Sequence, residues 1–368
     1  MKNVAEYAAY RENAADLSLL YERALEAGER ELYIPAGEYV LHRPLRLISD
    51  MSITADGFAH ITAADGEFQK EDSFLICGYN IGNVRITGGH WDGNVAGNPR
   101  ESYKSGAQTG VSFEFGGVRD LVISGLTMTD PGSYHIRIGA SANILIENIV
   151  FDDRNYCWCQ DGIHIGGFCE NIVIRGISTK GMATNDDLVA LNADDIFRYS
   201  QNRGMTSGYI RHVLIEDLSG EAVYTGIRLL STVSEISDVT VRNVRLGVRY
   251  YFLNLDGARY ASDGFYAPGE YPAICGKIRN VTVENAEVRK VTGNSHPLIV
   301  FETRADNFRL KNFRRLPDAG DGARVPTARF RNIPTCRVRL NGRLMPDSFE
   351  TDCDGIAELS VDSEPWED

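Results

Sequence analysis

Two short segments, DGIHI (161–165) and DLVAL (187–191), decide the fold of this sequence. Each alternates apolar with other residues, which is the period of a β-strand that has one face in a core. Asp161 and Asp187 open the two segments and are 26 residues apart (187 − 161). Strand segments that recur at such a distance indicate a stacked solenoid, in which matching residues of successive turns lie about 4.8 Å apart. We therefore expect the two aspartates to be neighbours in space, with alternate apolar residues such as Ile163 inside.

Similar strand-like stretches recur along the chain and predict one parallel sheet. They are SFLICGY (73–79), GVSFEFG (110–116), YHIRIG (134–139), DGIHIGG (161–167), DLVALN (187–192), TGIRLLS (225–231), YYFLNLDG (250–257) and HPLIVFET (296–303). A second series predicts another sheet: NVRI (83–86), DLVI (120–123), NILI (143–146), NIVI (171–174), HVLI (212–215), DVTV (238–241) and NVTV (280–283). Asn or Asp opens most of this series, which is typical of a bend with a left-handed backbone.

The rest of the chain is expected to protect the ends of this solenoid. Apolar residues recur with helical spacing from Leu17 to Leu25, and Gly28 follows as a helix stop. We expect three parts of one domain: a capping helix region in 1–30, a parallel β-helix in 31–316, and C-terminal strands that close the far end in 317–368. Insertions that could flank a groove fall near residues 91–108, 193–208 and 257–275.

Composition excludes several classes of partner. The net charge of −13 argues against nucleic acid and anionic membranes, and no apolar run is long enough to span a bilayer. The first residues do not have the pattern of a secretory signal, so we expect a cytoplasmic protein, or a secreted one if a leader has been removed. The sequence does not indicate the oligomeric state.

The cysteines invite a comparison with zinc sites. Seven cysteines are an odd number, which favours reduced thiols over a disulfide framework. Cys157, Cys159, His164 and Cys169 lie close together in sequence, but their spacing matches no standard zinc site. We therefore favour core packing for the cysteines and expect no metal and no cofactor.

Several segments carry a resemblance to a known family. They are IPAGEYVL (34–41), ITGGHWDGN (86–94), DPGSYHIRIGASANILIENIVF (130–151), DGIHI (161–165), TNDDLVAL (184–191) and TGIRLL (225–230). With these segments the chain resembles the pectin-lyase-like right-handed parallel β-helix proteins, and specifically glycoside hydrolase family 28, over about residues 30–290. The last three are similar to that family's NTDGID, GDDxxAI and RIK motifs.

The resemblance implies an acid/base hydrolysis of an α-linked glycosidic bond with inversion. Carried over motif by motif, Asp161 and Asp187 would activate water, Asp186 would be the general acid, and Arg228 would bind substrate. The implied substrate is a plant-type oligosaccharide or polysaccharide fragment, and the implied role is polysaccharide degradation.

The chain departs from the family pattern at several positions. Cys159 and Gln160 replace the Asn and Thr of the first motif, His164 replaces its second Asp, and Leu230 replaces the Lys of RIK. Nothing that resembles the family's Gly-His-Gly motif lies between Leu191 and Ile210. The 41 residues from Asp187 to Arg228 (228 − 187) are too few for the two coils that the family usually has there. These changes put a galacturonan substrate in doubt more than hydrolysis itself.

The residues alone support the same chemistry. Three clustered carboxylates repel one another, which raises at least one pKa and keeps a proton available for a leaving group. Asp161, Asp186 and Asp187 could instead only cap turns, but their matching register beside Arg228 and His135 favours a site.

Further side chains near the aspartates are candidates for substrate binding. Strand alternation places Arg137, His164 and Arg228 in one outward, exposed column. His135 either touches the leaving group or only forms hydrogen bonds within a bend. Trp158, like Tyr134, either stacks on a sugar ring or packs in the core.

Two other functions remain open at this point. A polysaccharide lyase of the same fold would need a cationic base, and Leu230 removes the most obvious lysine. In a non-catalytic carbohydrate-binding β-helix, the three aspartates could be replaced without altering any turnover, because there would be none.

Overall fold

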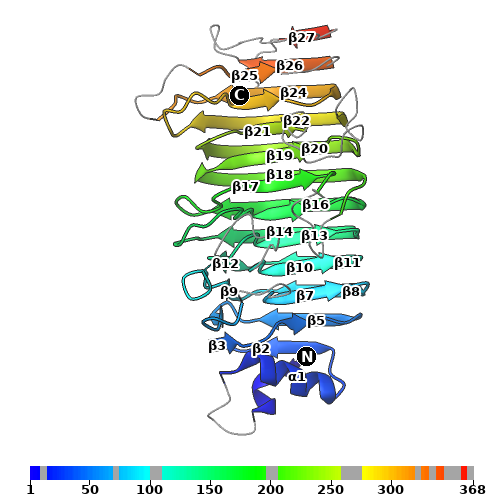
Figure 1. Ribbon diagram of the computed structural model, residues 1–368, viewed down its shortest axis with the longest axis vertical. Coiled ribbons are helices and arrows are strands. Elements are labelled where there is room, and N and C mark those ends of the chain that lie inside the picture. Colours follow the sequence, from blue (N-terminus) through cyan, green and yellow to red (C-terminus); the bar gives the residue numbers. More distant parts are fainter. Residues whose placement is uncertain are drawn as a thin grey trace.

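The protein is an elongated stack of coils. A computed structural model describes residues 1–8, 15–68, 74–99, 110–195, 206–257, 276–319, 325–330, 337–343 and 358–362. Successive coils lie one above another along the long axis, and the N-terminal helix covers one end (Figure 1). Nearly all strand pairs are parallel, so the architecture is the parallel β-helix that the strand repeats predict.

Two sets of hydrogen-bonded strands build the stack in the described part of the chain. The first sheet holds β4 (Leu45–Arg46), β7 (Ile76–Tyr79), β10 (Phe113–Gly116), β13 (Ile136–Gly139), β15 (Ile163–Ile165), β17 (Asp187–Asn192), β19 (Thr225–Leu230), β21 (Leu253–Asp256), β23 (Ile299–Phe301) and β25 (Ala328–Phe330). The second set holds β1 (Lys2–Asn3), β2 (Glu31–Ile34), β3 (Gly37–Leu41), β5 (Met51–Ala55), β6 (Ala59–Ala63), β8 (Gly82–Thr87), β9 (His90–Asp92), β11 (Arg119–Ser124), β12 (Thr127–Thr129), β14 (Ala142–Phe151), β16 (Cys169–Thr179), β18 (Ile210–Val223), β20 (Glu235–Val248), β22 (Lys277–Lys290), β24 (Ala305–Arg315), β26 (Arg337–Arg343) and β27 (Glu358–Asp362). Both predicted series of strands are present and fall in separate sheets.

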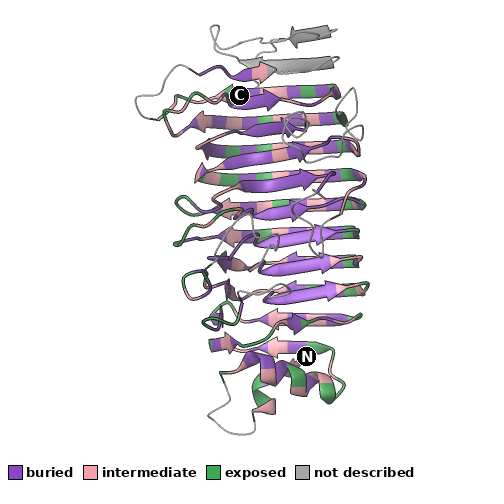
Figure 2. Ribbon diagram, in the orientation of Figure 1, coloured by how far each residue is buried: buried purple, intermediate pink, exposed green. Residues whose placement is uncertain are grey.

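The register of the first sheet puts apolar side chains in one continuous core. Ile163 pairs with Ile136 on one side and with Val189 on the other, and Val189 pairs with Ile227. All four side chains are fully buried, so the prediction for Ile163 is confirmed. Figure 2 shows the burial alternating along the strands of the stack.

Left-handed residues make the corners between the sides of each coil. Asn143 (φ 58°) and Asn171 (φ 57°) occupy equivalent corners, and the amide nitrogen of Asn171 donates to the Asn143 side-chain oxygen at 3.0 Å. A second left-handed residue follows five positions later, for example Asn148 (φ 56°) inside β14. Each long strand therefore bends at this residue and forms two sides of the coil. The part after the bend is a third side of the β-helix, which the two predicted series do not include.

The two ends of the stack differ. Helix α1 (Leu17–Glu26), preceded by the 3-10 helix η1 (Val4–Tyr7), buries Leu17 and Leu20 against the first coils, and Gly28 follows it with φ 83°. At the other end β25, β26 and β27 continue the parallel pairing. Among the described residues, no helix is both long and apolar enough to cross a membrane.

Candidate active site

Three aspartates converge where β15 and β17 begin. Asp161 and Asp187 occupy matching positions in neighbouring coils, and the backbone N–H of Gly162 donates to the Asp187 carbonyl at 2.9 Å. Asp186 directly precedes β17. One oxygen from each of the three carboxylates lies within 4.8 Å of the others. Asp161 and Asp187 are buried, whereas Asp186 is partly exposed, so it is the most accessible member of the group.

Arg228 lies one coil further along and neutralises part of this charge. Strand β17 pairs directly with β19, so the 41-residue interval after Asp187 contains a single coil. As a result, the Arg228 guanidinium lies 3.6 Å from the Asp187 carboxylate and 2.7 Å from that of Asp256. Arg228 is therefore committed to two carboxylates, which limits its predicted role in substrate binding.

The outward column of the first sheet is a buried network, not an exposed face. Glu114 pairs in register with Arg137, and Arg137 pairs with His164. Arg137 is only 1% exposed and donates from Nε to Glu114 at 2.6 Å. The Tyr134 ring covers this column, with its centroid 4.4 Å from the His164 ring and 5.4 Å from the Arg137 guanidinium. The prediction of an exposed column is wrong for Arg137 and His164, which Tyr134 shields from solvent, whereas Arg228 is partly exposed.

His164 connects Asp161 to a carboxylate that the motifs do not include. Its Nδ1 lies 2.6 Å from Asp161 Oδ2, and its Nε2 lies 3.0 Å from Asp195 Oδ2. Because the side chain is 2% exposed and carboxylates occupy both ring nitrogens, His164 lies behind Asp161, away from solvent. This corrects its assignment as a substrate-binding residue.

His135 is also structural. It is completely buried against Phe151, its Nδ1 lies 2.9 Å from the Asp161 carbonyl oxygen, and its Nε2 lies 2.9 Å from Asp153 Oδ1. Of the two predicted roles, hydrogen bonding within a bend is therefore correct. His135 fixes the backbone of Asp161.

The two aromatic candidates, Trp158 and Tyr134, differ in their exposure to solvent. Trp158 is 73% exposed, so it is not a core residue and can meet a ligand. Tyr134 is buried over Arg137 and His164, so it packs inside the site. The insertions near 91–108, 193–208 and 257–275 fall largely outside the described residues.

Burial and charge set the protonation of the inner groups. Burial, with a smaller contribution from the Asp187 carboxylate, raises the pKa of Asp161 to about 6 against the lowering effect of His164. Burial alone would lower the pKa of His164, but the Asp195 and Asp161 carboxylates outweigh it and raise that pKa to about 10. Burial also raises the pKa of Glu114 to about 7, although the neighbouring arginine opposes it. Between pH 6 and 10, Asp161 and His164 therefore form an ion pair.

The aspartate cluster has the oxygen ligands that a hard cation prefers. Within the described residues it is the group of acidic side chains close enough to surround an ion, and it includes no cysteine. His164 and Arg228 already supply positive charge to Asp161 and Asp187. We therefore assign no metal to the cluster.

The sequence motifs did not reveal four buried carboxylates that support the site. Glu114 and Asp256 extend the outward side of the first sheet, Asp153 holds His135, and Asp195 holds His164. Glu114 could have been found from the alternation of its strand, FEFG. Asp153 and Asp195 lie outside the strands, where periodicity gives no direction for a side chain.

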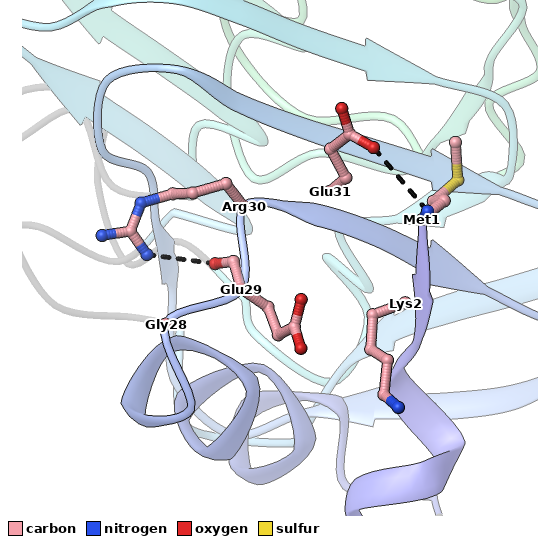
Figure 3. Close-up of a pocket in the computed structure, with 6 residues that line it drawn as sticks. All are labelled: Met1, Lys2, Gly28, Glu29, Arg30 and Glu31. Carbon is pink, nitrogen blue, oxygen red and sulfur yellow. Dashed lines mark hydrogen bonds and ion pairs between the residues drawn. The ribbon is translucent and has the colours of Figure 1, made fainter.

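A separate surface hollow lies in the first coil, far along the stack from the aspartates. Met1, Lys2, Gly28, Glu29, Arg30 and Glu31 line it (Figure 3). Its main contact is an exposed ion pair between the Met1 amino group and Glu31 at 3.6 Å. It contains no catalytic grouping.

Comparisons with known proteins bear on the family and the fold of this chain. The profile of the glycosyl hydrolases family 28 matches residues 26–208, about half of the chain. No curated protein matches the sequence.

Solved structures share the fold at low sequence identity. A surface adhesin of Streptococcus pneumoniae, PfbA, superposes with a TM-score of 0.63 at 13% identity, over 98% of this chain and 91% of that one. The family 28 exopolygalacturonase of Yersinia enterocolitica gives 0.54 at 16% identity, over 99% and 78%. Dex49A from Penicillium minioluteum gives 0.59 at 16% identity, over 90% and 60%. The chain is therefore a pectin-lyase-like right-handed parallel β-helix protein and a glycoside hydrolase of the family 28 type.

Proposed function

We propose that this enzyme hydrolyses a glycosidic bond in a plant-type oligosaccharide or polysaccharide fragment, with inversion at the anomeric carbon. The observation that carries the proposal is the convergence of Asp161, Asp186 and Asp187, with carboxylate oxygens within 4.8 Å of one another. A pair of carboxyl groups, one protonated and one ionised, is the usual machinery for cleaving this bond.

The surroundings of each aspartate support a division of roles. Asp161 has His164 at 2.6 Å and Asp187 has Arg228 at 3.6 Å, and a cation favours the ionised form that activates water. Asp186 is the most accessible carboxyl, which suits the group that protonates the leaving oxygen. Inversion rests on the family resemblance. The carboxyl groups of inverting enzymes are commonly about 6.5–9.5 Å apart and those of retaining enzymes about 5–5.5 Å, so the anomeric configuration of the product has to be measured.

A lyase reaction has less support. It needs a cationic base beside a uronate, and the position of the family's lysine is filled here by Leu230, which is fully buried. An unsaturated sugar product, detected by its ultraviolet absorbance, would favour the lyase over our proposal.

The test begins with a panel of oligosaccharides and proceeds to variants. Asp186→Asn keeps the shape of the side chain but removes the proton donor. It should lower the rate of hydrolysis of the natural substrate by a factor of about 10² to 10⁴. A substrate with a good leaving group should recover part of this loss in Asp186→Asn and little in Asp161→Asn. Asp217→Asn, an exposed corner aspartate whose Oδ1 accepts from Asn243, is the matched control and should keep full activity.

Two results would contradict the proposal. Equal losses in Asp186→Asn and Asp161→Asn on both kinds of substrate would remove the division of roles. Binding of oligosaccharides with no turnover in the wild-type protein would instead indicate a carbohydrate-binding β-helix. Proton NMR of the first-formed product distinguishes inversion from retention.

A further inference from the structure

His164 is placed between two buried carboxylates. Asp161 approaches its Nδ1 at 2.6 Å and Asp195 approaches its Nε2 at 3.0 Å, and both carboxylates are almost completely buried. The Tyr134 ring lies against the imidazole at 4.4 Å. The histidine therefore has little freedom to turn and almost no access to solvent.

Counting protons defines the state of this group. A neutral imidazole has one N–H donor, whereas ionised carboxylates only accept, so two contacts of hydrogen-bond length require an imidazolium or a protonated carboxyl. Two carboxylates facing one buried space also repel each other unless a cation lies between them. Of the other charged groups nearby, Glu114 and Arg137 pair with each other at 2.6 Å. Arg228, on the other side of Asp161, pairs with Asp256 at 2.7 Å and Asp187 at 3.6 Å. A cationic His164 satisfies both requirements at once.

The bridge also fixes the orientation of Asp161. One carboxylate oxygen, Oδ2, is held by His164, while Oδ1 lies 3.3 Å from the backbone N–H of Asp187. We propose that His164 is a positioning residue: a buried imidazolium, anchored by Asp195, that keeps Asp161 ionised and oriented to activate water. This inference rests on the proposed function, because it assumes that Asp161 acts as a base.

The protonation state of His164 can be measured without any substrate. In protein labelled with ¹⁵N-histidine, His164 should keep protons on both ring nitrogens at pH 8.5, and its signals are identified as those missing in His164→Gln. His135 also faces two acceptors, so His135→Gln serves to assign its signals separately. In Asp195→Asn the amide oxygen can still accept a hydrogen bond but the anion is gone, so His164 should titrate at lower pH. A His164 that titrates near the ordinary value of about 6.5 in the wild-type protein would overturn the bridge.

Activity tests the positioning role. In His164→Gln the cation next to Asp161 is lost, so the acid limb of kcat/KM should move to higher pH by about one unit or more, with kcat reduced about tenfold or more and KM little changed. His212→Gln, an exposed histidine on another side of the coil, is the matched control and should change neither value. If His164→Gln keeps the acid limb and the kcat of the wild-type protein, the positioning role is refuted. An inactive wild-type protein with a cationic His164 would refute only the proposed function.

Discussion

The sharpest test of the structure is the removal of the Arg228 guanidinium. Arg228→Met keeps most of the side-chain length but leaves Asp256, which is completely buried, without the cation that lies 2.7 Å away. At an effective dielectric constant of about 20, a charge pair about 4 Å apart is worth roughly 4 kcal/mol. Removing one partner of a buried pair commonly costs about 3–5 kcal/mol, and we expect the free energy of unfolding to fall by that amount.

A double-mutant cycle measured by urea unfolding separates charge from packing. Asp256→Asn removes the stranded charge, so Arg228→Met combined with Asp256→Asn should be more stable than Arg228→Met alone. Arg175→Met is the control, because Arg175 lies 2.6 Å from Glu147 but on an exposed face where solvent screens the pair. The reasoning is refuted if Arg228→Met costs no more than Arg175→Met, or if the second substitution restores nothing.

Three further predictions concern pH, corner geometry and the exposed tryptophan. Because burial raises the pKa of Asp161 to about 6 and a base must be ionised, kcat/KM should fall as the pH drops through about 6; an undiminished rate at pH 4.5 would contradict this. His212 occupies a left-handed corner (φ 56°) where neighbouring coils have Asn or Asp, so His212→Asn should stabilise the protein by about 0.5–1 kcal/mol in thermal unfolding, and a lower melting temperature would show the corner argument to be wrong. Trp158→Ala should raise KM for an oligosaccharide while the melting temperature stays the same, because the ring is 73% exposed; a large drop in melting temperature would mean that it packs instead.

Much of the fold could be predicted because alternation and spacing are local properties of the chain. The period-two alternation around Ile163 and Val189 predicts which side chains point into the core. The spacing between successive strand segments then predicts which strands are neighbours. The third side of the coil was not predicted, because Asn148 lies inside a continuous strand, β14, where a bend interrupts neither the pairing nor the alternation.

The site was predicted less completely than the fold. The motifs identified Asp161, Asp186 and Asp187, and the structure brings these three together. Alternation shows which way a side chain points but not what covers it, so the burial of Arg137 was missed. Asp195 was missed because it lies beyond the end of β17, where the strand period no longer predicts the direction of a side chain.

The single coil between Asp187 and Arg228 has a consequence for how such enzymes diversify. Coils are the unit of length in this fold, so a gene that gains or loses one coil moves every later side chain along the axis by about 4.8 Å and leaves the chemistry of each coil intact. Here the short interval brings the arginine into contact with Asp187. Insertion of one coil would separate Arg228 from Asp187 and leave its contact with Asp256 in place. Coil number is therefore a stepwise control of the charge around the aspartates, which duplication, in nature or in the laboratory, can adjust.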